Sequence, residues 1–586
     1  MKTMNLTTTA MNLVFDIETD DLKATKIHCI VAQDMDTKEI YKFPPNKLDK
    51  GYALLESADK LVGHNIIGFD IPMVEKFSNV KLSNKTIVDT LVLSRLFNPV
   101  REGGHSLESW GYRLSLPKIE FEDYLEYSTE MLNYCIRDVQ LNTLVFEKLK
   151  KESKGFSQDS VYLEQQIARI LKEQESHGFL FDDRKAEILL ADLREKKGNI
   201  EKLVHEVFKP KLVVIKEVIP KLKQDGTLSK QGLTDEEYEE RLYTDDITPF
   251  TRRKIQEFNL GSRKQIGEYL IEFGWKPKRF TPTGQPMVDE KTLANIKKIP
   301  EARLIAKYLL LQKRIAQIDS WFVAQQEDNR VHGFVIPNGT ITGRMAHRSP
   351  NMAQVPSVKS PFGTECRSCW IVPEGYKLVG IDASGLELRI LAHYMNDEEF
   401  TNEIINGDIH AFNQKLAGLE SRDQAKTFIY ALIYGAGDRK LGSVVGGSAK
   451  EGARLRQHFF DSKPSFKSLG DKVRRSATKK YLKGLDGRKI FVRHPHAALN
   501  TLLQGGGAIV MKRALAMLDS LIRLQTLDAH FVANIHDEWQ MEVREDITNF
   551  VGNLAVDCIQ TAGNYYNLLC PLDGEYKVGD NWSETH

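Results

Sequence analysis

The first 150 residues alternate between short apolar runs and longer amphipathic stretches. Residues 12–17, 27–32 and 61–62 are predicted to be strands, because each is a compact apolar run next to polar residues. A helix is expected from about residue 71, and residues 123–150 follow a helical period. Strands that alternate with helices indicate a compact α/β domain.

The pattern changes farther along the chain. Residues 161–207 are predicted to be helical with a break at His177-Gly178, and helices return at residue 262 and at residues 301–321. Residues 208–258 are charged and mixed. From about residue 331, short strands alternate with long helices, and no internal repeat or low-complexity tract is present.

Composition narrows the class of protein. At about 150 residues per domain, a chain of 586 residues predicts about four domains. Hydrophobic residues make up 41% and charged residues 27%, which is typical of a folded soluble protein and excludes a disordered or fibrous chain. No apolar stretch approaches the roughly 18 residues that a membrane span needs, so no membrane partner is expected, and residues 1–10 lack a signal-peptide core. Six cysteines are too few for a disulfide framework and favour a reducing, intracellular compartment.

The net charge is only +1, but the charges are unevenly distributed. Residues 421–530 hold 21 lysines and arginines against 8 aspartates and glutamates, so the rest of the chain is net negative. A basic block of this length is typical of a surface that binds phosphates, whereas a solvated charged face is the alternative. The pattern favours a nucleic-acid partner.

Candidate metal ligands occur early in the chain. Asp16 and Glu18 are two residues apart at the end of a predicted strand, which places both carboxylates on one face. Such a pair suits a hard cation such as Mg²⁺, although the pair alone is a weak signal. Asp70 follows, and then Tyr134 and Asp138, which share a helix face. Four carboxylates with a tyrosine suit two-metal hydrolysis of a phosphodiester.

A second group of candidate residues lies late in the chain. Residues 376–381 form an apolar strand that ends in Asp382, where a metal ligand or a helix cap is expected. A helix over residues 421–434 carries Arg422, Lys426, Tyr430 and Tyr434 at intervals of four, with Ser421 as its expected N-cap. The two cations would bind a triphosphate and the two rings a base or sugar, whereas an amphipathic core helix is the alternative.

The last candidate segment is a predicted β-hairpin over residues 531–543, whose tip carries His536, Asp537 and Glu538. With Asp382, this hairpin would supply the two aspartates that hold two metal ions across a reacting phosphate. Cys366 and Cys369 could form half of a zinc site, but no second pair follows, so buried core thiols are the favoured interpretation.

These motifs together resemble known families. The order D-x-E, N-x-x-x-F-D and Y-x-x-x-D resembles the tyrosine-bearing DEDD 3′–5′ exonucleases. The segments D-A-S-G-L-E-L-R, R-D-Q-A-K-T-F-I-Y-A-L-I-Y-G-A-G and I-H-D-E resemble motifs A, B and C of family A (polymerase I-like) DNA polymerases, above all the replicative enzymes of short-tailed phages. The resemblance runs from Asp16 to Trp582 and weakens over residues 208–258.

The resemblance implies a ribonuclease H-like exonuclease domain (1–155) followed by a right-hand polymerase with mixed α/β and α+β domains. The expected parts are a thumb (156–335) with an insertion at 208–258, a palm (336–409 and 486–586) and fingers (410–485). The implied activity is template-directed synthesis of phage DNA with proofreading, in the cytoplasm of an infected bacterium. A nuclease with a DNA-binding polymerase-like module and a single-subunit RNA polymerase are the alternatives.

The resemblance also assigns roles to individual residues. The expected polymerase metal ligands are Asp382, Asp537 and the Ala383 carbonyl, and Glu538 and Lys426 are also expected to be catalytic. The expected exonuclease metal ligands are Asp16, Glu18, Asp70 and Asp138, with Tyr134 orienting water. The triphosphate would contact Arg422, Lys426 and His410. The nucleotide would also contact Tyr430, Tyr434 and Glu387, and the Glu387 side chain would block a ribose 2′-OH. Primer and template would contact Arg344, Asn500, Gln504 and His536. Two Mg²⁺ ions are expected at each site, with Mn²⁺ as a substitute.

The expected partners are primer–template DNA and dNTPs, together with a phage helicase-primase and a single-strand-binding protein. A processivity factor is a further candidate partner for the insertion at residues 208–258. In the best-known phage relative a longer insertion recruits host thioredoxin, but this segment is shorter and that partner is not carried over. The first half of the insertion has six lysines against Glu217 and Asp225, which suits contact with phosphates, whereas a solvated surface excursion is the alternative.

Overall fold

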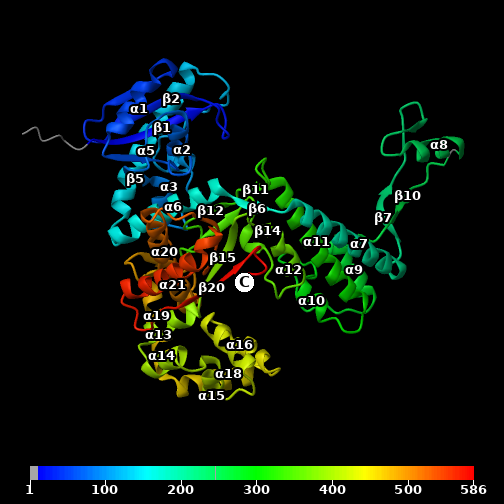
Figure 1. Ribbon diagram of the computed structural model, residues 1–586. Helices are drawn as coiled ribbons and strands as arrows, with labels where there is room; N and C mark the ends of the chain where they lie inside the picture. The colour runs from blue at the N-terminus through cyan, green and yellow to red at the C-terminus, as the bar shows by residue number, and fades with distance from the viewer. Residues whose placement is uncertain (1–10, 245, 586) are drawn as a thin grey trace, which may run out of the picture. The chain divides into compact units, whose positions relative to one another are not determined.

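The computed structural model describes residues 11–244 and 246–585 (Figure 1). The chain divides into two compact units, one made of residues up to 182 together with residues 324 onward, and the other of residues 183–323. The second unit lies inside the predicted thumb range, and the finer domain boundaries stay a prediction. Among the described residues, no helix combines the length and the apolar character that a membrane crossing requires.

The N-terminal part of the first unit is built on a five-stranded sheet with the strand order β3-β2-β1-β4-β5. Its strands are β1 (Asn12–Thr19), β2 (Ile27–Asp34), β3 (Ile40–Phe43), β4 (Lys60–Gly63) and β5 (Thr86–Asp89). The three strands predicted from the sequence are confirmed. β1 pairs antiparallel with β2 and parallel with β4.

Helices cover both faces of this sheet (Figure 1). They are α1 (Leu48–Ser57), α2 (Asp70–Phe77), α3 (Thr90–Phe97), α4 (Leu107–Arg113) and α5 (Thr129–Glu152). Successive side chains of β1 point to opposite faces of the sheet. Leu13 and Phe15 therefore lie in one core and Val14 lies in the other, on the side of α5. Helix α5 begins six residues later than the period predicts, because the Ser128 hydroxyl caps it by accepting the Met131 N–H at 3.0 Å.

The C-terminal part of the first unit is centred on a four-stranded sheet with the order β18-β19-β15-β20. Its strands are β15 (Tyr376–Ala383), β18 (Ala529–Ile535), β19 (Glu538–Arg544) and β20 (Gly574–Gly579). Val379 and Ile381 pair with Met541 and Trp539 on the apolar face, where α21 (Thr548–Tyr565) packs beside α20 (Ala498–Leu524). The predicted strand before Asp382 and the predicted hairpin are confirmed.

A group of helices between β15 and α20 completes this part. They are α13 (Leu386–Met395), α14 (Glu398–Ile405), α15 (Ile409–Ala417), α16 (Arg422–Ile433), α17 (Asp438–Val444), α18 (Ala449–Ser462) and α19 (Pro464–Ser476), followed by the hairpin of β16 (Tyr481–Lys483) and β17 (Lys489–Phe491). Ser421 caps α16 as predicted and forms a capping box with Gln424, which satisfies two amide donors at the helix start.

One long helix and several short elements lie between these two sheets in the chain. They are α6 (Gln158–His177), β6 (Phe179–Phe181), β11 (Arg330–Val331), β12 (Phe334–Ile336), β13 (Ala346–Arg348), α12 (Gly363–Ser368) and β14 (Trp370–Ile371). β11, β6 and β14 form a small sheet of their own. The interruption predicted at His177-Gly178 separates α6 from β6. Cys366 and Cys369 are buried thiols, which agrees with the core interpretation.

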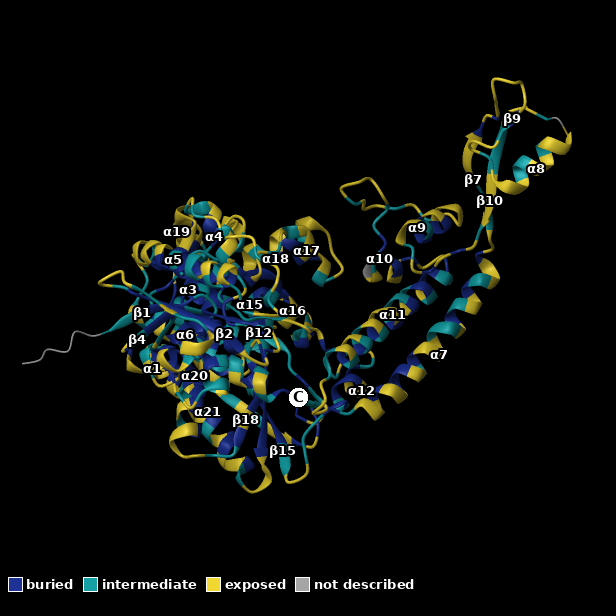
Figure 2. Ribbon diagram, turned by 90° about the horizontal axis from the view of Figure 1, so that it is seen from above, coloured by how far each residue is buried: buried dark blue, intermediate teal, exposed yellow. Residues whose placement is uncertain are grey.

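In the part of the chain that the structure describes, the second unit consists of helices and of an insertion that holds a strand ribbon and one further helix. The helices are α7 (Asp183–Val207), α9 (Arg263–Glu272), α10 (Glu290–Ala294) and α11 (Glu301–Ala324); the insertion holds β7 (Lys211–Val218), β8 (Lys221–Leu222), β9 (Leu228–Ser229), α8 (Asp235–Thr244) and β10 (Phe250–Gln256). β7 pairs antiparallel with β10, and much of the insertion is exposed (Figure 2). Both ends of the insertion meet in an aromatic cluster, in which the rings of Phe208 and Phe258 are 5.0 Å apart and Tyr269 packs against both.

A fully buried ion network links α6, α20 and the β16–β17 hairpin. Lys512 Nζ lies 2.7 and 2.9 Å from the two oxygens of Glu164, and Arg488 Nη1 donates to the same carboxylate at 2.5 Å. Arg488 Nε also donates to Asp486 at 2.8 Å. Burial lowers the pKa of Lys512 to about 8, because the charged form loses its hydration. The Glu164 carboxylate is therefore the shared partner of two buried cations.

We expect Glu164→Gln to lower the free energy of unfolding by about 3–5 kcal/mol, since two buried cations lose their common partner. Chemical denaturation followed by fluorescence measures the change. The matched control is Glu173→Gln on the same helix, whose carboxylate is half-exposed in its ion pairs with Arg169 and Arg523; we expect a loss of less than about 1 kcal/mol there. Equal losses in the two variants would contradict a special role for the buried network.

Candidate active sites

The first candidate site lies at one end of the C-terminal sheet. Asp382 is the penultimate residue of β15, and Asp537 lies in the turn between β18 and β19. The strand register pairs Asp382 directly with Glu538, and the Ala383 N–H donates to the Asp537 carbonyl at 3.1 Å. The antiparallel pairing thus brings together two acidic segments that are far apart in the sequence.

Glu538 differs from the two aspartates in its surroundings. Its side chain is buried, and its carboxylate accepts hydrogen bonds from the Trp582 indole N–H at 2.8 Å and from Gln540 at 2.7 Å. His536 stands beside it in the turn with a left-handed backbone (φ 59°). The turn therefore combines an uncommon backbone conformation with a firmly held carboxylate.

Helix α16 presents the predicted stripe of cations and aromatic rings. Arg422 Nε donates to Asp408 at 2.7 Å, and this hydrogen bond lowers the pKa of Asp408 to about 2. The rings of Tyr430 and Tyr434 are 6.2 Å apart, and the His410 ring lies 6.4 Å from that of Tyr430. Burial lowers the pKa of His410, and the charges of Arg422 and Lys426 lower it further. The structure thus groups the predicted triphosphate residues at one end of this stripe.

Glu387 connects α13 to that stripe. Arg344 Nη2 donates to one Glu387 oxygen at 3.0 Å, and the Tyr434 hydroxyl donates to the other at 2.9 Å. Burial raises the pKa of Tyr434, and the Glu387 charge raises it further, so the phenol remains a donor. Glu387 thereby fixes the positions of two predicted nucleotide and DNA contacts.

The remaining predicted DNA contacts lie on separate elements. Asn500 and Gln504 are half-buried and four residues apart on α20, so they share one face of the helix. Burial lowers the pKa of His536 and Arg344 lowers it further, which favours the neutral imidazole. Contact of these residues with DNA stays a prediction.

The second candidate site lies between β1 and α5 of the N-terminal sheet. Asp16 and Glu18 project from β1 toward α5, which carries Tyr134 and Asp138. Asp70 begins α2 and accepts the Ile17 N–H at 3.2 Å, so it stands beside the same strand. All five predicted residues of this group are brought together.

Burial shifts the pKa values of these carboxyl groups upward. Burial raises the pKa of Glu18 to about 9 and that of Asp70 to about 7. The pKa of Asp16 rises well above its usual range for the same reason, and neighbouring Asp70 and Glu18 add to the effect. Each buried carboxyl group destabilises the charged form of its neighbours. Such a cluster therefore favours the binding of a multivalent cation.

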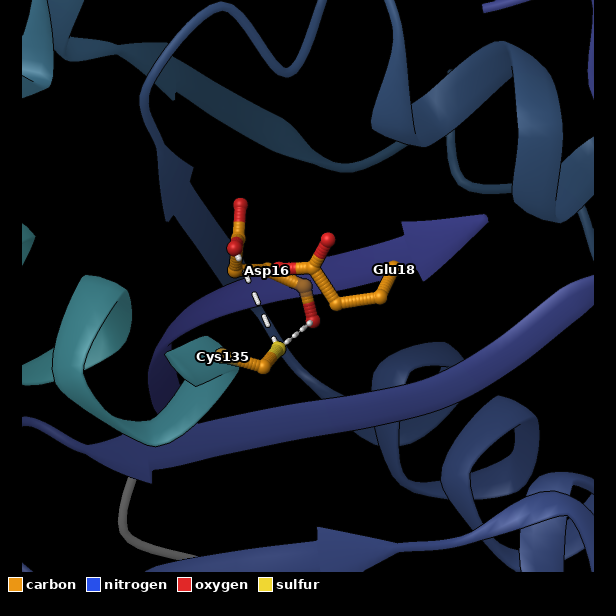
Figure 3. A group of neighbouring side chains, drawn as sticks. All are labelled: Asp16, Glu18 and Cys135. Atoms are coloured by element: carbon orange, nitrogen blue, oxygen red, sulfur yellow. Dashed lines mark hydrogen bonds between the residues drawn. The ribbon is translucent and has the colours of Figure 1, made fainter. Parts of the chain in front are cut away.

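The sequence interpretation missed two residues of this site, Lys118 and Cys135. Lys118 Nζ lies 2.5 Å from an Asp138 oxygen and 4.6 Å from the centre of the Tyr134 ring. It lies in an irregular connection, so no sequence period identifies it. Cys135 Sγ lies 3.6 Å from the Asp16 carbonyl oxygen and 3.8 Å from its carboxylate (Figure 3). The spacing of three between Cys135 and Asp138 on one helix is a signal that could have revealed it.

The donor atoms of this site fit a divalent cation. Ligand atoms of Asp16, Glu18 and Cys135 all lie within 4.8 Å of one another (Figure 3). Carboxylate oxygens suit Mg²⁺ or Mn²⁺, whereas the thiol is a softer donor. Asp382 and Asp537 offer the same type of oxygen donor at the first site.

The donor atoms of both sites suit metal-associated phosphates: the first site also has the cations of α16, and the second is a cluster of buried carboxylates. The family model for DNA polymerase family A matches residues 234–584. The chain is 33% identical to the DNA-directed DNA polymerase of Enterobacteria phage T3 and 32% identical to that of Escherichia phage T7. Each match covers 98% of this chain and all of the relative. The chain therefore belongs to DNA polymerase family A.

A solved structure has a similar fold. The POL domain of Pol1 from M. smegmatis, in complex with DNA primer-template and dNTP, matches with a TM-score of 0.79 at 19% identity, and the match covers 98% of this chain and 96% of that one. The family match confirms the polymerase I-like fold expected from the sequence. Members of this family use divalent metal ions, in agreement with the donor atoms at both sites.

We expect Glu387→Ala to increase the use of ribonucleotides relative to deoxyribonucleotides by about tenfold or more. The change removes the side chain that the resemblance places against a ribose 2′-OH, and specificity of this kind depends on such a clash. Incorporation opposite one template base, measured with rNTP and dNTP separately, gives the ratio. Glu398→Ala, at an exposed position of α14, is the control and should leave the ratio unchanged. An unaltered ratio in Glu387→Ala would exclude the sugar-discriminating role.

Proposed function

We propose that this protein copies phage DNA by template-directed synthesis and removes mismatched primer ends with its own 3′–5′ exonuclease, in the cytoplasm of an infected bacterium. DNA polymerase activity is that of the family to which the chain belongs. The observation that supports the proofreading part is the second carboxylate cluster, whose residues lie on the N-terminal sheet and on the helices that cover it. The RNA polymerase alternative is disfavoured because the family and its two full-length phage relatives are DNA polymerases.

At the polymerase site, we assign binding and orientation to this chain's side chains. Arg422, Lys426 and His410 hold the triphosphate, and Tyr434 stacks at the new base pair while Glu387 holds its hydroxyl. Asp382, Asp537 and the Ala383 carbonyl would hold two Mg²⁺ ions, which supply Lewis-acid charge for attack of the primer 3′-OH on the α-phosphate. Arg344, Asn500, Gln504 and His536 position primer and template.

At the exonuclease site, Asp16, Glu18, Asp70 and Asp138 would hold two Mg²⁺ ions, which supply an activated water and charge at the phosphate. The phenol of Tyr134 orients that water. It remains a neutral donor because burial raises its pKa, and the hydrogen bond with Tyr124 adds to this effect. Phe121 and Tyr124 pack around the Tyr134 ring, with ring centres 5.5 and 6.3 Å from it, and fix its position.

The double variant Asp16→Ala/Glu18→Ala should lose 3′–5′ degradation by at least about a thousandfold and keep near-normal primer extension, since each site has its own carboxylates. Asp537→Ala should show the reverse. Degradation of labelled single-stranded DNA and extension of a primer measure the two activities in one preparation. If either variant lost both activities while folded, two independent sites would be ruled out. If the wild-type protein extended primers but never degraded them, the proofreading part of the proposal would be refuted and the polymerase part would stand.

Tyr430 supports a prediction about the 3′ position of the incoming sugar. The resemblance implies that a tyrosine here accepts dideoxynucleotides readily, and the half-buried ring lies beside Tyr434 and His410. We expect wild-type protein to be terminated readily by ddNTPs, and Tyr430→Phe to favour dNTPs by at least about tenfold more, because the phenol hydroxyl is lost. Competition between a ddNTP and its dNTP measures selectivity. Unchanged selectivity would remove Tyr430 from the sugar site.

We further assign to the insertion at residues 208–258 a role in processivity, by itself or with a partner protein. Lys211 and Lys230 are paired with Glu272 and Asp235, whereas Lys209, Lys216, Lys221 and Lys223 are exposed. These charges suit duplex phosphates. Exposed Leu212 and its cross-strand partner Ile255 suit a protein partner instead, because apolar side chains side by side on an exposed ribbon favour burial.

Deleting residues 210–250 should shorten the product made per binding event several-fold and leave single-nucleotide insertion near normal. The deletion retains Phe208, Phe258 and Tyr269, whose packing closes the base of the insertion. Product length is measured with a DNA trap, with and without host extract. A variant with Lys→Gln changes at 209, 216, 221 and 223 separates the effect of the positive charges from the effect of the ribbon's presence. Its DNA binding should depend less on salt. An unchanged product length in the deletion would exclude a role in processivity.

A further inference from the structure

Residues 581–585 pack directly against the two strands that carry the polymerase carboxylates. The Trp582 side chain is fully buried, and its backbone N–H donates to the Trp370 carbonyl at 3.0 Å. The Thr585 hydroxyl donates to Gln540 of β19 at 2.7 Å. The segment is therefore part of the packed structure beside β15 and β19.

Gly380 makes this close approach possible. It pairs with Gln540 across the sheet, two residues before Asp382. A Cβ at this position would lie 2.5 Å from the Thr585 carbonyl oxygen and 2.7 Å from Gln540 Nε2. Any side chain at residue 380 would therefore push the segment away from the catalytic strand.

Two neutral donors from this region meet at one carboxylate. The Trp582 indole and the Gln540 amide both donate to Glu538 Oε1, at 2.8 and 2.7 Å. Thr585 in turn donates to the Gln540 oxygen, which orients the amide so that its NH₂ group faces Glu538. Hydrogen bonds to a buried carboxylate are strong because the charge is assisted and water is excluded.

Arg367 of α12 supports the same arrangement. Its guanidinium lies 4.4 Å from the centre of the Trp582 ring, and its Nη1 lies 3.7 Å from Glu538 Oε1. Its Nε donates to the Pro356 carbonyl at 3.0 Å, which fixes the side chain. The indole is thus held by a cation on its face and by the carboxylate at its N–H.

Glu538 connects this packing to the reaction site. It lies opposite Asp382 in the strand register and immediately follows Asp537 in the chain. Asp382, Glu538, Gly380 and Thr585 line one pocket of about 360 Å³. The turn that carries Asp537 also holds His536 at a positive φ, a conformation that costs a non-glycine residue free energy and that surrounding contacts must maintain.

We propose that residues 581–585 are a positioning element of the polymerase site, in which Trp582 and Gln540 hold the Glu538 carboxylate and so keep the Asp537 turn in its reactive conformation. Trp582 is a positioning residue, because it acts on the reaction through Glu538. The assignment rests on the polymerase activity proposed above, and extension by the wild-type protein in the same assay tests that activity separately.

The test variant is Trp582→Phe, which keeps an aromatic ring for Arg367 and removes the indole N–H. The matched control is Trp539→Phe, which truncates an equally buried indole on the opposite, apolar face of the same sheet. Gln540→Met removes the other donor. Each protein is measured for single-nucleotide turnover at saturating dNTP, KM for dNTP, Kd for primer–template, exonuclease rate on single strands, and thermal midpoint.

We expect Trp582→Phe and Gln540→Met each to lower turnover by about tenfold, the effect of losing about 1.4 kcal/mol of stabilisation in the transition state. The KM for dNTP, the Kd for DNA and the exonuclease rate should stay within about twofold of wild type, and Trp539→Phe should keep wild-type turnover. Unchanged turnover in Trp582→Phe overturns the proposal. Parallel losses of turnover and thermal midpoint in Trp582→Phe and Trp539→Phe also overturn it, because they would indicate general packing.

Discussion

Bringing several carboxylates together against mutual repulsion is the constraint on which both sites depend. In water, acidic side chains remain apart, and only a rigid framework holds them within reach of a shared cation. Each sheet holds acidic residues at or near the end of a strand. They are Asp16 and Glu18 on β1 and Asp382 on β15. A strand holds its side chains by backbone hydrogen bonds that the carboxylates themselves do not supply, so repulsion cannot separate them.

The two sites differ in how they compensate for the charge. In the exonuclease-like site, Lys118 and Asp138 form a mostly buried ion pair, and burial raises the pKa of Glu18 to about 9. In the proposed polymerase site, Glu538 accepts hydrogen bonds from two neutral donors, Trp582 and Gln540, and the Arg367 guanidinium lies 3.7 Å away. The first arrangement places a cation in close contact with a carboxylate. The second adds oriented dipoles to a more distant cation, and oriented dipoles cost little reorganisation when a substrate binds.

Contacts over long sequence separations keep these frameworks rigid. Glu164 joins α6 to Lys512 on α20 and to Arg488, and Glu387 joins Arg344 to Tyr434. Each carboxylate serves two partners, so one substitution loosens two elements at once. Residues that share a partner in this way are energetically coupled, so the effects of substituting them should not be additive.

The sequence by itself determined the strands at β1 and β15, the β18–β19 hairpin, and the capped stripe of α16, because those patterns arise from local periodicity and capping. Together with the resemblance, it also identified the five acidic and phenolic residues that the N-terminal sheet brings together. Only the tertiary structure revealed the contacts of Lys118 with Asp138 and of Trp582 with Glu538, because each pair joins residues that lie far apart in the sequence. The β7–β10 ribbon was likewise decided by pairing across a long connection. Cys135 was missed although its spacing of three from Asp138 on one helix is a local signal. Local order is encoded in neighbouring residues, whereas contacts that close long loops depend on the whole chain having folded.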